Sequence, residues 1–386
     1  MNIIHLAPIK SHSLINDISQ RKINIAQEGI SVSVPRLAES QKMAGNRVAV
    51  ISSFPSEKVV SKDIYWDSFG KGSFNFLSYN LIFKKINKKF EKVDLLNIHD
   101  IYNLKQIFFS FFFIFKGVKI FITPRGAFSK EALKRSKNKK LLFLFFFKIY
   151  AKFIFSFIAL NKGEEKQIKK IFPKIKIIII GNGVNFSEKR NNKLNIYTQE
   201  KLKNNTFNIG FLGRFDVYIK GLDFLLNAYL KYQEEINNVR IKLHLLGEHR
   251  AKETDSKTFI NSIKSKLPFP EMLEVRGPFY GFSKWEELAK LDILIQPSRT
   301  EGMPNTVLEA MATGIPCAVT DNTNVSELII KASAGWKIKT SEKGVLDFFM
   351  EAHRFKKENL LKLGDNAKKY AQEYLTWERI GKIKYF

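Results

Sequence analysis

Residues 297–316 read Pro-Ser-Arg-Thr-Glu-Gly-Met-Pro-Asn-Thr-Val-Leu-Glu-Ala-Met-Ala-Thr-Gly-Ile-Pro. The apolar run directly before this stretch predicts a buried strand, and residues 304–312 predict a helix. Pro304 is favoured in the first helical turn, because proline lacks the N–H that has no partner there. The stretch therefore places Glu301 in a loop between a strand and a helix, and Glu309 within the helix.

Strand and helix patterns alternate along the chain. Each predicted strand is a short, mostly apolar run bounded by Gly, Pro or Asn, which is typical of strands buried on both faces of a parallel sheet. The predicted strands are Asn2–Ala7, Arg47–Ser52, Asp94–Ile98, Lys119–Thr123, Phe155–Leu160 and Lys176–Ile180 in the first half, and Phe207–Leu212, Ile241–Leu246, Leu273–Arg276, Leu291–Gln296, Cys317–Thr320 and Gly335–Ile338 in the second. Because right-handed crossovers join such strands, the alternation predicts two doubly wound, Rossmann-like α/β domains.

The length of 386 residues suits two domains. A polar, unpatterned stretch, residues 186–206, predicts the linker between them. The first domain is expected over residues 1–185 and the second over 207–370. Residues 371–386 are expected to form a terminal helix that packs back toward the first domain.

The composition excludes several classes of protein. Hydrophobic residues make up 45% of the chain, aromatic residues 13% and charged residues 26%, which excludes a disordered chain, a collagen and a heptad rod. Cys317 is the single cysteine, so an intramolecular disulfide is impossible and a reducing compartment fits. The apolar start, residues 1–8, lacks the basic flank of a signal peptide, and no apolar run is long enough to span a bilayer as a helix. We therefore expect a cytoplasmic protein.

Positive charge is concentrated in the first half. The net charge is +27, and residues 1–185 carry 32 Lys and Arg against 12 Asp and Glu. This excess predicts an anionic partner such as a phosphorylated ligand, nucleic acid or an anionic lipid surface, or it reflects a generally lysine-rich composition. Phenylalanine-rich helices are predicted near 107–116 and 141–155, with lysines beside the second, as in helices that bind a membrane surface. These helices either pack against the sheet or contact the inner face of the cell membrane.

Two cations flank the turn after the strand that ends at Leu212. Arg214 stands at the end of this strand, and Lys220 and Gly221 open the next predicted helix. Two cations beside the positive end of a helix can clamp a diphosphate. The alternative is a surface loop with two ordinary cations.

The two glutamates of the opening stretch can bind hydroxyl groups. Carboxylates accept hydrogen bonds, here from vicinal hydroxyls such as those of ribose or a hexose. Glu309 lies among apolar residues of its predicted helix, which argues against a solvated surface position. The N–H groups of residues 303–306 are expected to point toward whatever Glu301 faces.

Weaker signals lie elsewhere. Gly29 precedes a predicted helix and either lets an anion approach backbone N–H groups or forms a simple turn. His99 ends a predicted strand and is either structural or part of a site. Because His244, His249 and His353 lack metal-ligand spacing, no metal is expected.

These motifs resemble those of the retaining glycosyltransferases of family 4, the glycosyl transferases group 1, which have the GT-B fold. The matching segments are the E-x7-E pair Glu301 and Glu309, Gly213-Arg214 with Lys220-Gly221, the turn Asn182-Gly183-Val184, and the first helix and second strand from Ser33–Ala38 through Gly45–Val50. The resemblance covers most of the chain. It implies two Rossmann-like domains that face a central cleft and close over a donor.

The resemblance also implies roles for individual residues. Arg214 and Lys220 would bind the donor diphosphate, Glu309 the ribose hydroxyls and Glu301 the transferred sugar. The backbone near 275–277 would face the nucleotide base. Further donor contacts are implied for Gly29, Arg276, Gly302, Met303, Pro304, Asn305 and Thr306.

The first half departs from the family pattern. Arg125, in the segment Thr-Pro-Arg-Gly, takes the place of a histidine that many members carry. His99 matches the second histidine of an H-x-H motif in which Asn97 replaces the first. Arg125 and His99 are therefore candidate catalytic residues. The usual paired glycines of the first loop reduce to Gly29.

The implied function is transfer of a sugar from a nucleotide-diphosphate sugar to a hydroxyl, with retention of configuration. The leaving phosphate would take the acceptor proton, and the two cations with the helix end would stabilise it, so neither a base nor a metal cofactor is needed. The basic first domain would present the acceptor, such as a lipid-linked glycan.

By analogy, this transfer would serve cell-envelope polysaccharide synthesis, meaning capsule, O-antigen or lipopolysaccharide. One alternative is a sugar-nucleotide epimerase of the same fold. The other is a non-catalytic basic protein that binds membranes or RNA. No RNA-binding motif is visible in the sequence, so nucleic acid is not an expected partner.

Overall fold

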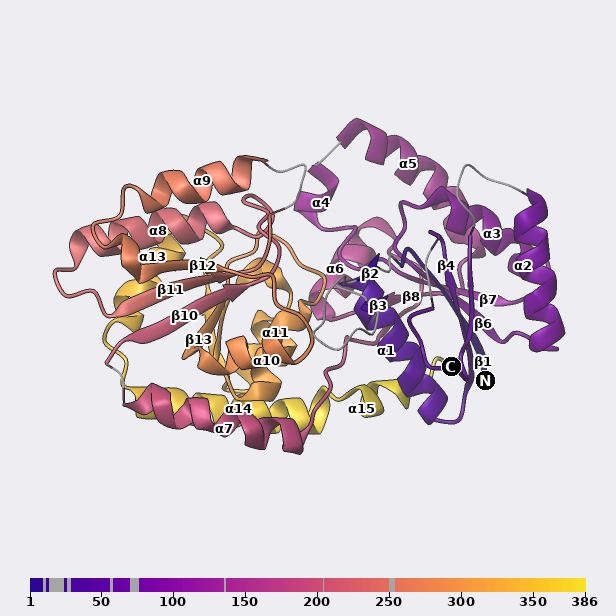
Figure 1. Cartoon of the computed structure of the whole chain (residues 1–386). Coiled ribbons are helices and arrows are strands. Elements are labelled where there is room, and N and C mark those ends of the chain that lie inside the picture. Colours follow the sequence, from indigo (N-terminus) through magenta and orange to yellow (C-terminus); the bar gives the residue numbers. More distant parts are fainter. Residues whose placement is uncertain are drawn as a thin grey trace. The chain divides into compact units, whose positions relative to one another are not determined.

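The structure is a computed structural model that describes residues 1–9, 12–13, 24–25, 29–55, 58–69, 76–134, 137–203, 205–249 and 254–386. The chain divides into two compact units: unit 1 comprises 1–183 with 377–386, and unit 2 comprises 184–376. Each unit has a parallel sheet with helices on both faces (Figure 1). The predicted pair of doubly wound, Rossmann-like α/β domains is confirmed.

Unit 1 is built on a seven-stranded sheet of order β5-β4-β1-β6-β7-β8-β9, and every pairing is parallel. Its strands are β1 (Asn2–Ala7), β4 (Arg47–Ser52), β5 (Tyr65–Ser68), β6 (Leu95–His99), β7 (Lys119–Thr123), β8 (Ser156–Ala159) and β9 (Ile177–Ile179). Its helices are α1 (Ile30–Met43), α2 (Phe76–Lys89), α3 (Leu104–Ile114), α4 (Lys130–Lys134), α5 (Lys137–Tyr150), α6 (Lys162–Ile171) and α15 (Trp377–Gly381). The short strands β2 (His12–Ser13) and β3 (Asn24–Ile25) form a separate antiparallel pair.

Side chains of β1 alternate between the two faces of this sheet. Ile4 and Leu6 enter the core that α2, α3 and α5 cover, whereas Ile3 and Ala7 enter the core beneath α1 and α15. This alternation has the period of two that strand geometry imposes. Because both faces are covered, the strand reads as a continuous apolar run in the sequence.

Unit 2 has a six-stranded parallel sheet of order β12-β11-β10-β13-β14-β15. Its strands are β10 (Phe207–Leu212), β11 (Ile241–Leu246), β12 (Leu273–Arg276), β13 (Ile293–Gln296), β14 (Cys317–Thr320) and β15 (Gly335–Ile338). Its helices are α7 (Glu188–Leu202), α8 (Leu222–Glu235), α9 (Thr254–Lys264), α10 (Gly281–Lys290), α11 (Asn305–Thr313), α12 (Ser326–Lys331), α13 (Glu342–Ala352) and α14 (Lys357–Tyr374). Helices α8, α9 and α13 cover one face, and α10, α11 and α14 cover the other (Figure 1).

Both sheets have the strand order of doubly wound folds. The order reverses between β1 and β6 in unit 1, and between β10 and β13 in unit 2. Ligands of open α/β sheets bind beyond the carboxyl ends of the strands at such a reversal. The loops after these four strands are therefore the places in which to look for a site.

The segment predicted as a linker differs from expectation. Residues 186–206 contain the 15-residue helix α7, which belongs to unit 2. The Ser187 side chain caps this helix, the side chain of Leu194 is buried, and Asn191 Nδ2 donates to a carbonyl oxygen of α11 at 2.9 Å. Because polar Asn191 supplies part of the buried face, the segment lacks the apolar periodicity that predicts a helix.

The end of the chain returns to unit 1. Helix α15 packs against α1 so closely that a Cβ at Gly381 would lie 2.5 Å from the carbonyl carbon of Ser40. Tyr385 is buried in the same unit. The expected start of this terminal segment, residue 371, lies instead within α14 of unit 2. In the part of the chain that the structure describes, no helix has both the length and the apolar character needed to cross a membrane.

Candidate active site

The loop from Gly213 to Gly221 leads from β10 into α8 and is held against the segment after β13. Gly221 has a φ of 68°, and a Cβ there would lie 2.1 Å from the carbonyl oxygen of Pro297. Only glycine tolerates both the left-handed backbone and this approach. The N–H of Arg299 donates to the carbonyl oxygen of Ile219 at 2.9 Å, which joins the two loops.

A bidentate ion pair reinforces this junction. Arg299 Nη1 and Nη2 each lie 2.6 Å from one carboxylate oxygen of Asp223, in the first turn of α8. The guanidinium also stacks 3.6 Å from the ring centroid of Phe224. Planar, doubly hydrogen-bonded pairs of this kind fix geometry more strongly than single contacts. Sequence reasoning missed the pair, because its two members lie far apart in the chain.

Glu301 is brought together with Lys220, as the predicted site requires. Lys220 Nζ lies 2.5 Å from Glu301 Oε1, and both side chains are largely buried. Ser298 Oγ and Gln296 Nε2 donate to the same oxygen at 2.9 and 3.3 Å. Asn324 Nδ2 donates to the Glu301 carbonyl oxygen at 2.6 Å. Three side chains thus hold this carboxylate in place, and Asn324 holds the backbone of the same residue.

Arg214 lies on the same loop as Lys220, and Asp216 organises the turn that carries both. Asp216 Oδ1 accepts from the N–H of Ile219 at 2.8 Å, and its carbonyl oxygen accepts from the N–H of Lys220 at 3.0 Å. Arg214 Nη2 lies 3.9 Å from Asp216 Oδ2. The two predicted cations therefore belong to one structured turn at the carboxyl end of β10.

Glu309 lies in α11 and contacts a different cation. Its Oε1 accepts from Lys284 Nζ at 2.6 Å. Its Oε2 is buried and has no hydrogen-bond partner among the residues that the structure describes. The Arg190 guanidinium interacts electrostatically with Glu309. Burial lowers the pKa of Arg190, and the charge of Glu309 partly offsets this by raising it. A buried carboxylate oxygen without a partner costs free energy unless a ligand pairs with it.

Helix α11 begins directly after the loop that carries Glu301. Its first residue is Asn305, followed by Thr306, and Pro304 is its N-cap. Gly302 and Met303 complete the connection, and the Met303 side chain is buried. The positive end of the α11 dipole therefore adjoins the Glu301 loop, where it favours a bound anion.

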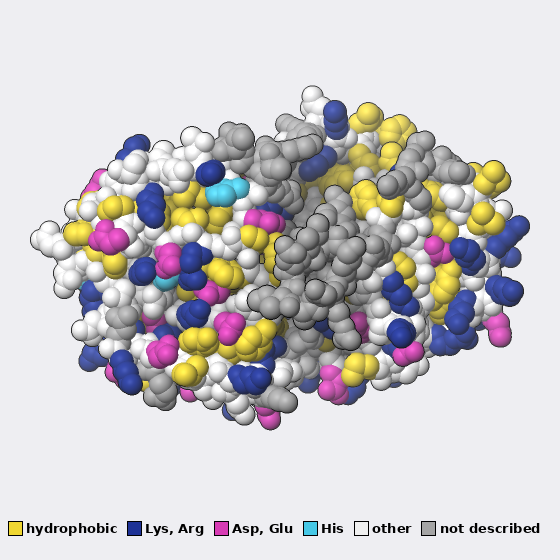
Figure 2. Space-filling model, viewed as in Figure 1, with side chains coloured by type: hydrophobic (Ala, Val, Ile, Leu, Met, Phe, Trp, Pro, Cys, Tyr) yellow, Lys and Arg dark blue, Asp and Glu magenta, His cyan; other side chains and the backbone are white. Residues whose placement is uncertain are grey.

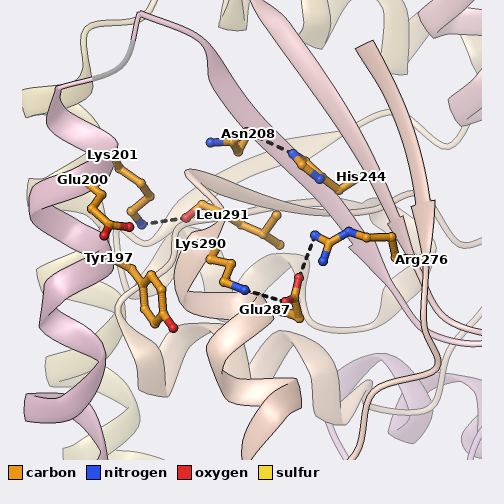
Figure 3. A pocket seen from close by; sticks show the side chains of 9 residues that line it. All are labelled: Tyr197, Glu200, Lys201, Asn208, His244, Arg276, Glu287, Lys290 and Leu291. Carbon is orange, nitrogen blue, oxygen red and sulfur yellow. Dashed lines mark hydrogen bonds and ion pairs between the residues drawn. The ribbon is translucent and has the colours of Figure 1, made fainter. Parts of the chain in front are cut away.

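Arg276, another predicted donor residue, pairs with two carboxylates of unit 2. Its Nε lies 2.7 Å from Glu274 Oε1, and its Nη2 lies 2.7 Å from Glu287 Oε2. The side chain lines a cavity of about 260 Å³, whose other described lining residues are Tyr197, Glu200, Lys201, Asn208, His244, Glu287, Lys290 and Leu291 (Figure 3). The described lining residues of this cavity include none from the loops of Arg214 and Glu301.

In unit 1, the predicted residues His99 and Arg125 form one buried hydrogen-bond chain. Arg125 Nε donates to His99 Nδ1 at 3.2 Å, and His99 Nε2 lies 3.0 Å from His5 Nδ1. His5 Nε2 lies 2.7 Å from Gln41 Oε1, and Gln41 Nε2 lies 2.5 Å from the Tyr385 hydroxyl. Sequence reasoning missed His5, Gln41 and Tyr385, because each reads as part of an apolar or helical segment.

The donor-to-acceptor direction of these hydrogen bonds determines the tautomer of both histidines. Because a guanidinium only donates, His99 Nδ1 must accept, so the proton of His99 is on Nε2. The proton of His5 is then also on Nε2 and points to Gln41. Burial lowers the pKa of His5 to about 4, and burial with the charge of Arg125 holds the pKa of His99 well below its usual range. Both imidazoles are neutral at pH 7.

Arg125 is also held from two other sides. Its Nη1 donates to Ser33 Oγ at 3.0 Å and to Asn182 Oδ1 at 3.2 Å. Arg125 has a φ of 55°, which is unusual for a residue with a side chain, and burial lowers its pKa to about 10. Ser33 Oγ in turn donates to the carbonyl oxygen of Gly29, the N-cap of α1, which has a φ of 52°. Gly29 therefore lies beside the Arg125 cluster of unit 1.

Comparison with known proteins finds a family model that matches part of unit 2. Residues 206–354 match the sequence model of the family described as Glycosyl transferases group 1. Over these residues the chain is similar to the group 1 glycosyl transferases. The resemblance to the group 1 glycosyl transferases that the sequence motifs indicated is confirmed for this part of the chain. The matched region lies in unit 2 and contains Arg214, Lys220, Glu301 and Glu309.

A curated relative matches a longer part of the chain. A probable sucrose-phosphate synthase of Thermosipho melanesiensis is 26% identical over 278 residues, which is 67% of this chain and 60% of that protein. The chain thus spans about 60% of the length of this relative.

Solved structures show the GT-B fold over nearly the whole chain. Sucrose-phosphate synthase from Thermosynechococcus elongatus has a TM-score of 0.76 at 15% identity and covers 99% of this chain and 96% of its own. WaaG, a glycosyltransferase involved in lipopolysaccharide biosynthesis, has a TM-score of 0.67 at 16% identity and 98% coverage of both chains. Anabaena HepE, in complex with UDP and glucose, has a TM-score of 0.69 at 16% identity, with 99% and 97% coverage.

Proposed function

We propose that this chain transfers a sugar from a nucleotide-diphosphate sugar to a hydroxyl acceptor, with unit 2 binding the donor. The observation that carries the proposal is the Lys220–Glu301 pair at 2.5 Å, on loops that follow β10 and β13. These are the two strands between which the order of the sheet reverses. The position is where a doubly wound sheet binds its ligand.

Each group of this site matches one part of such a donor. Arg214 and Lys220, with the start of α11, provide positive charge for the diphosphate. Glu301 provides a fixed acceptor for hydroxyls of the transferred sugar, and Glu309 Oε2 provides one for the ribose. The diphosphate competes with Glu301 for Lys220, so donor binding leaves the Glu301 carboxylate available to sugar hydroxyls.

The finer features of the function follow from the family resemblance. Transfer proceeds with retention, and the leaving phosphate takes the acceptor proton. The acceptor is a lipid-linked glycan of a cell-envelope polysaccharide, for which the likeness to WaaG, involved in lipopolysaccharide biosynthesis, gives support. UDP-sugars are the first donors to test, because HepE structures of the same fold contain UDP and UDP-glucose.

A thermal-shift panel of UDP, GDP, ADP and their sugars tests the donor site. A ligand at about 100 times its Kd adds about 2.7 kcal/mol, enough to raise the Tm by several degrees. One nucleotide should raise the Tm of the native protein and of Lys231→Ala, which changes an exposed ion pair of unit 2. The shift should be lost in Arg214→Ala.

Product analysis then distinguishes sugar transfer from epimerisation of the sugar nucleotide. Incubation of the protein with the sugar nucleotide alone should give no epimer, and addition of a hydroxyl acceptor should release the nucleoside diphosphate. An epimer without acceptor would instead support the epimerase. No Tm shift with any nucleotide would contradict a donor site in unit 2.

A further inference from the structure

Helix α5 exposes an apolar face that its packing in unit 1 does not explain. Leu144, Phe147 and Tyr150 are buried in the core of the unit, as expected for an amphipathic helix. On the opposite face, five large apolar side chains are each between 51% and 64% exposed, namely Leu141, Leu142, Phe145, Phe146 and Ile149. We call these five residues the α5 patch. Figure 2 shows hydrophobic side chains gathered over α5.

Such a surface is costly in water. Single exposed apolar residues are ordinary, whereas a contiguous group on one helix face marks a surface that contacts something. Phe145 and Phe146 also contact each other, with ring centroids 5.4 Å apart. The sequence leaves open whether this helix packs against the sheet or has an exposed face. In the structure one face of α5 packs in the core, and the other face is exposed.

Lysines border the α5 patch on both sides. At 3.6 residues per turn the patch covers about 140° of the helix circumference, and Lys139 and Lys148 lie about 20° beyond its two edges. Both lysines are exposed, and so is Lys152 in the turn after the helix. Helix α5, from Lys137 to Tyr150, contains no Asp or Glu.

This arrangement fits a lipid surface better than a protein partner. Lysine is depleted in protein–protein interfaces, whereas lysine stems lie along apolar surface with their ammonium groups among lipid phosphates. The surrounding charge is favourable, because residues 1–185 carry 32 Lys and Arg against 12 Asp and Glu. Helix α5 has 14 residues and is about 21 Å long, so it would lie along a bilayer surface rather than across it.

We propose that the α5 patch docks unit 1 onto an anionic phospholipid surface. The five apolar side chains enter the boundary between headgroups and acyl chains, and Lys139, Lys148 and Lys152 bind lipid phosphates. The proposal rests on exposure and charge alone. Failure of the donor-site proposal for unit 2 would therefore leave this proposal unaffected, and the reverse also holds.

Sedimentation of the full-length protein with vesicles tests the proposal. The protein should bind vesicles of phosphatidylglycerol and phosphatidylcholine, bind pure phosphatidylcholine vesicles far less, and release as salt concentration rises. Phe145→Asp with Phe146→Asp should weaken binding by about tenfold or more, because it removes two large apolar side chains from the lipid. Lys139→Gln with Lys148→Gln should weaken binding and reduce its salt dependence.

The matched control places the same charges on unit 2. Ile196 and Ile330 are 60% and 50% exposed, so Ile196→Asp with Ile330→Asp tests whether any new surface charge reduces binding. This control should bind vesicles like the native protein, and all variants should keep the native Tm. Absent binding to anionic vesicles, or equal binding by the α5 variant, would overturn the proposal. Concentration-dependent self-association that disappears in the α5 variant would also overturn it, by assigning the patch to a second copy of the chain.

Discussion

His99 Nε2 donates a hydrogen bond to His5 Nδ1 across 3.0 Å in the interior of unit 1. This contact joins two parallel strands, β6 and β1, on either side of the point at which the sheet order reverses. At one end of the chain of hydrogen bonds is Arg125, a predicted site residue, and at the other is Tyr385, near the end of the polypeptide. These hydrogen bonds thus link the Arg125 guanidinium to residues of four other segments.

The neutral state of the two histidines predicts acid sensitivity. The folded-state pKa of His5 is lowered from 6.5 to about 4. The contribution of neutral His5 to the free energy of unfolding is therefore complete above pH 6.5 and is lost as pH falls toward 4. This loss amounts to about 3 kcal/mol of unfolding free energy. Urea unfolding at pH 7 and at pH 4.5 should show a smaller decrease for His5→Gln than for the native protein. An unchanged decrease would mean that other groups carry the acid sensitivity.

Removal of the Tyr385 hydroxyl should destabilise unit 1. Tyr385→Phe leaves the buried Gln41 Nε2 without its acceptor, which costs about 1–3 kcal/mol. Urea unfolding measures this loss. Tyr370→Phe is the control on α14, because Tyr370 is only partly buried and should change stability little. Equal effects of the two variants would show that the hydroxyl of Tyr385 does not support the network.

Glycine at position 221 is required by space as well as by backbone conformation. Gly221→Ala should lose about 2 kcal/mol or more, because its Cβ would meet the Pro297 carbonyl oxygen, and it should weaken nucleotide binding by displacing Lys220. Gly117→Ala is a matched control, since Gly117 has a φ of 71° but open space around its Cβ. The control should lose about 1 kcal/mol and retain nucleotide binding. Similar losses of unfolding free energy in both variants would show that the loop ending at Gly221 can move away from Pro297 at little cost.

Neutralising Glu309 should separate binding from stability. Glu309→Gln keeps the shape of the side chain but replaces a charged acceptor, so we expect the thermal shift with nucleotide to fall while the Tm without nucleotide changes little. Lys284 loses its carboxylate partner but is partly exposed and can be solvated. Glu327→Gln, an exposed carboxylate on α12, is the control and should keep the full shift. A retained shift in Glu309→Gln would remove this residue from the donor site.

Much of the fold is predictable from local patterns. All six strands of unit 2 were expected near their observed positions, since strands buried on both faces read as short apolar runs. β5 was not expected, because the half-buried segment Tyr65–Ser68 at the sheet edge contains Asp67 and lacks such a run. α7 was not expected, because Asn191 replaces an apolar residue on its buried face.

Prediction of the site was less complete. The spacing of Glu301 and Glu309 identified both carboxylates, but not that each has its own lysine, Lys220 for one and Lys284 for the other. The donor contact of Arg276 stays a prediction, and the sequence did not indicate that Arg276 pairs with Glu274 and Glu287. Such partners come from separate strands and helices, so no local pattern in the sequence records them.

By itself, the sequence determined the doubly wound α/β class, the order of its strands along the chain and the family motifs, because these depend on periodicity and short-range spacing. Only the tertiary structure decided which charges meet, which face of α5 stays exposed and how Tyr385 reaches the interior of unit 1. These outcomes depend on packing between residues tens to hundreds of positions apart, where the distance along the chain says nothing about the distance in space.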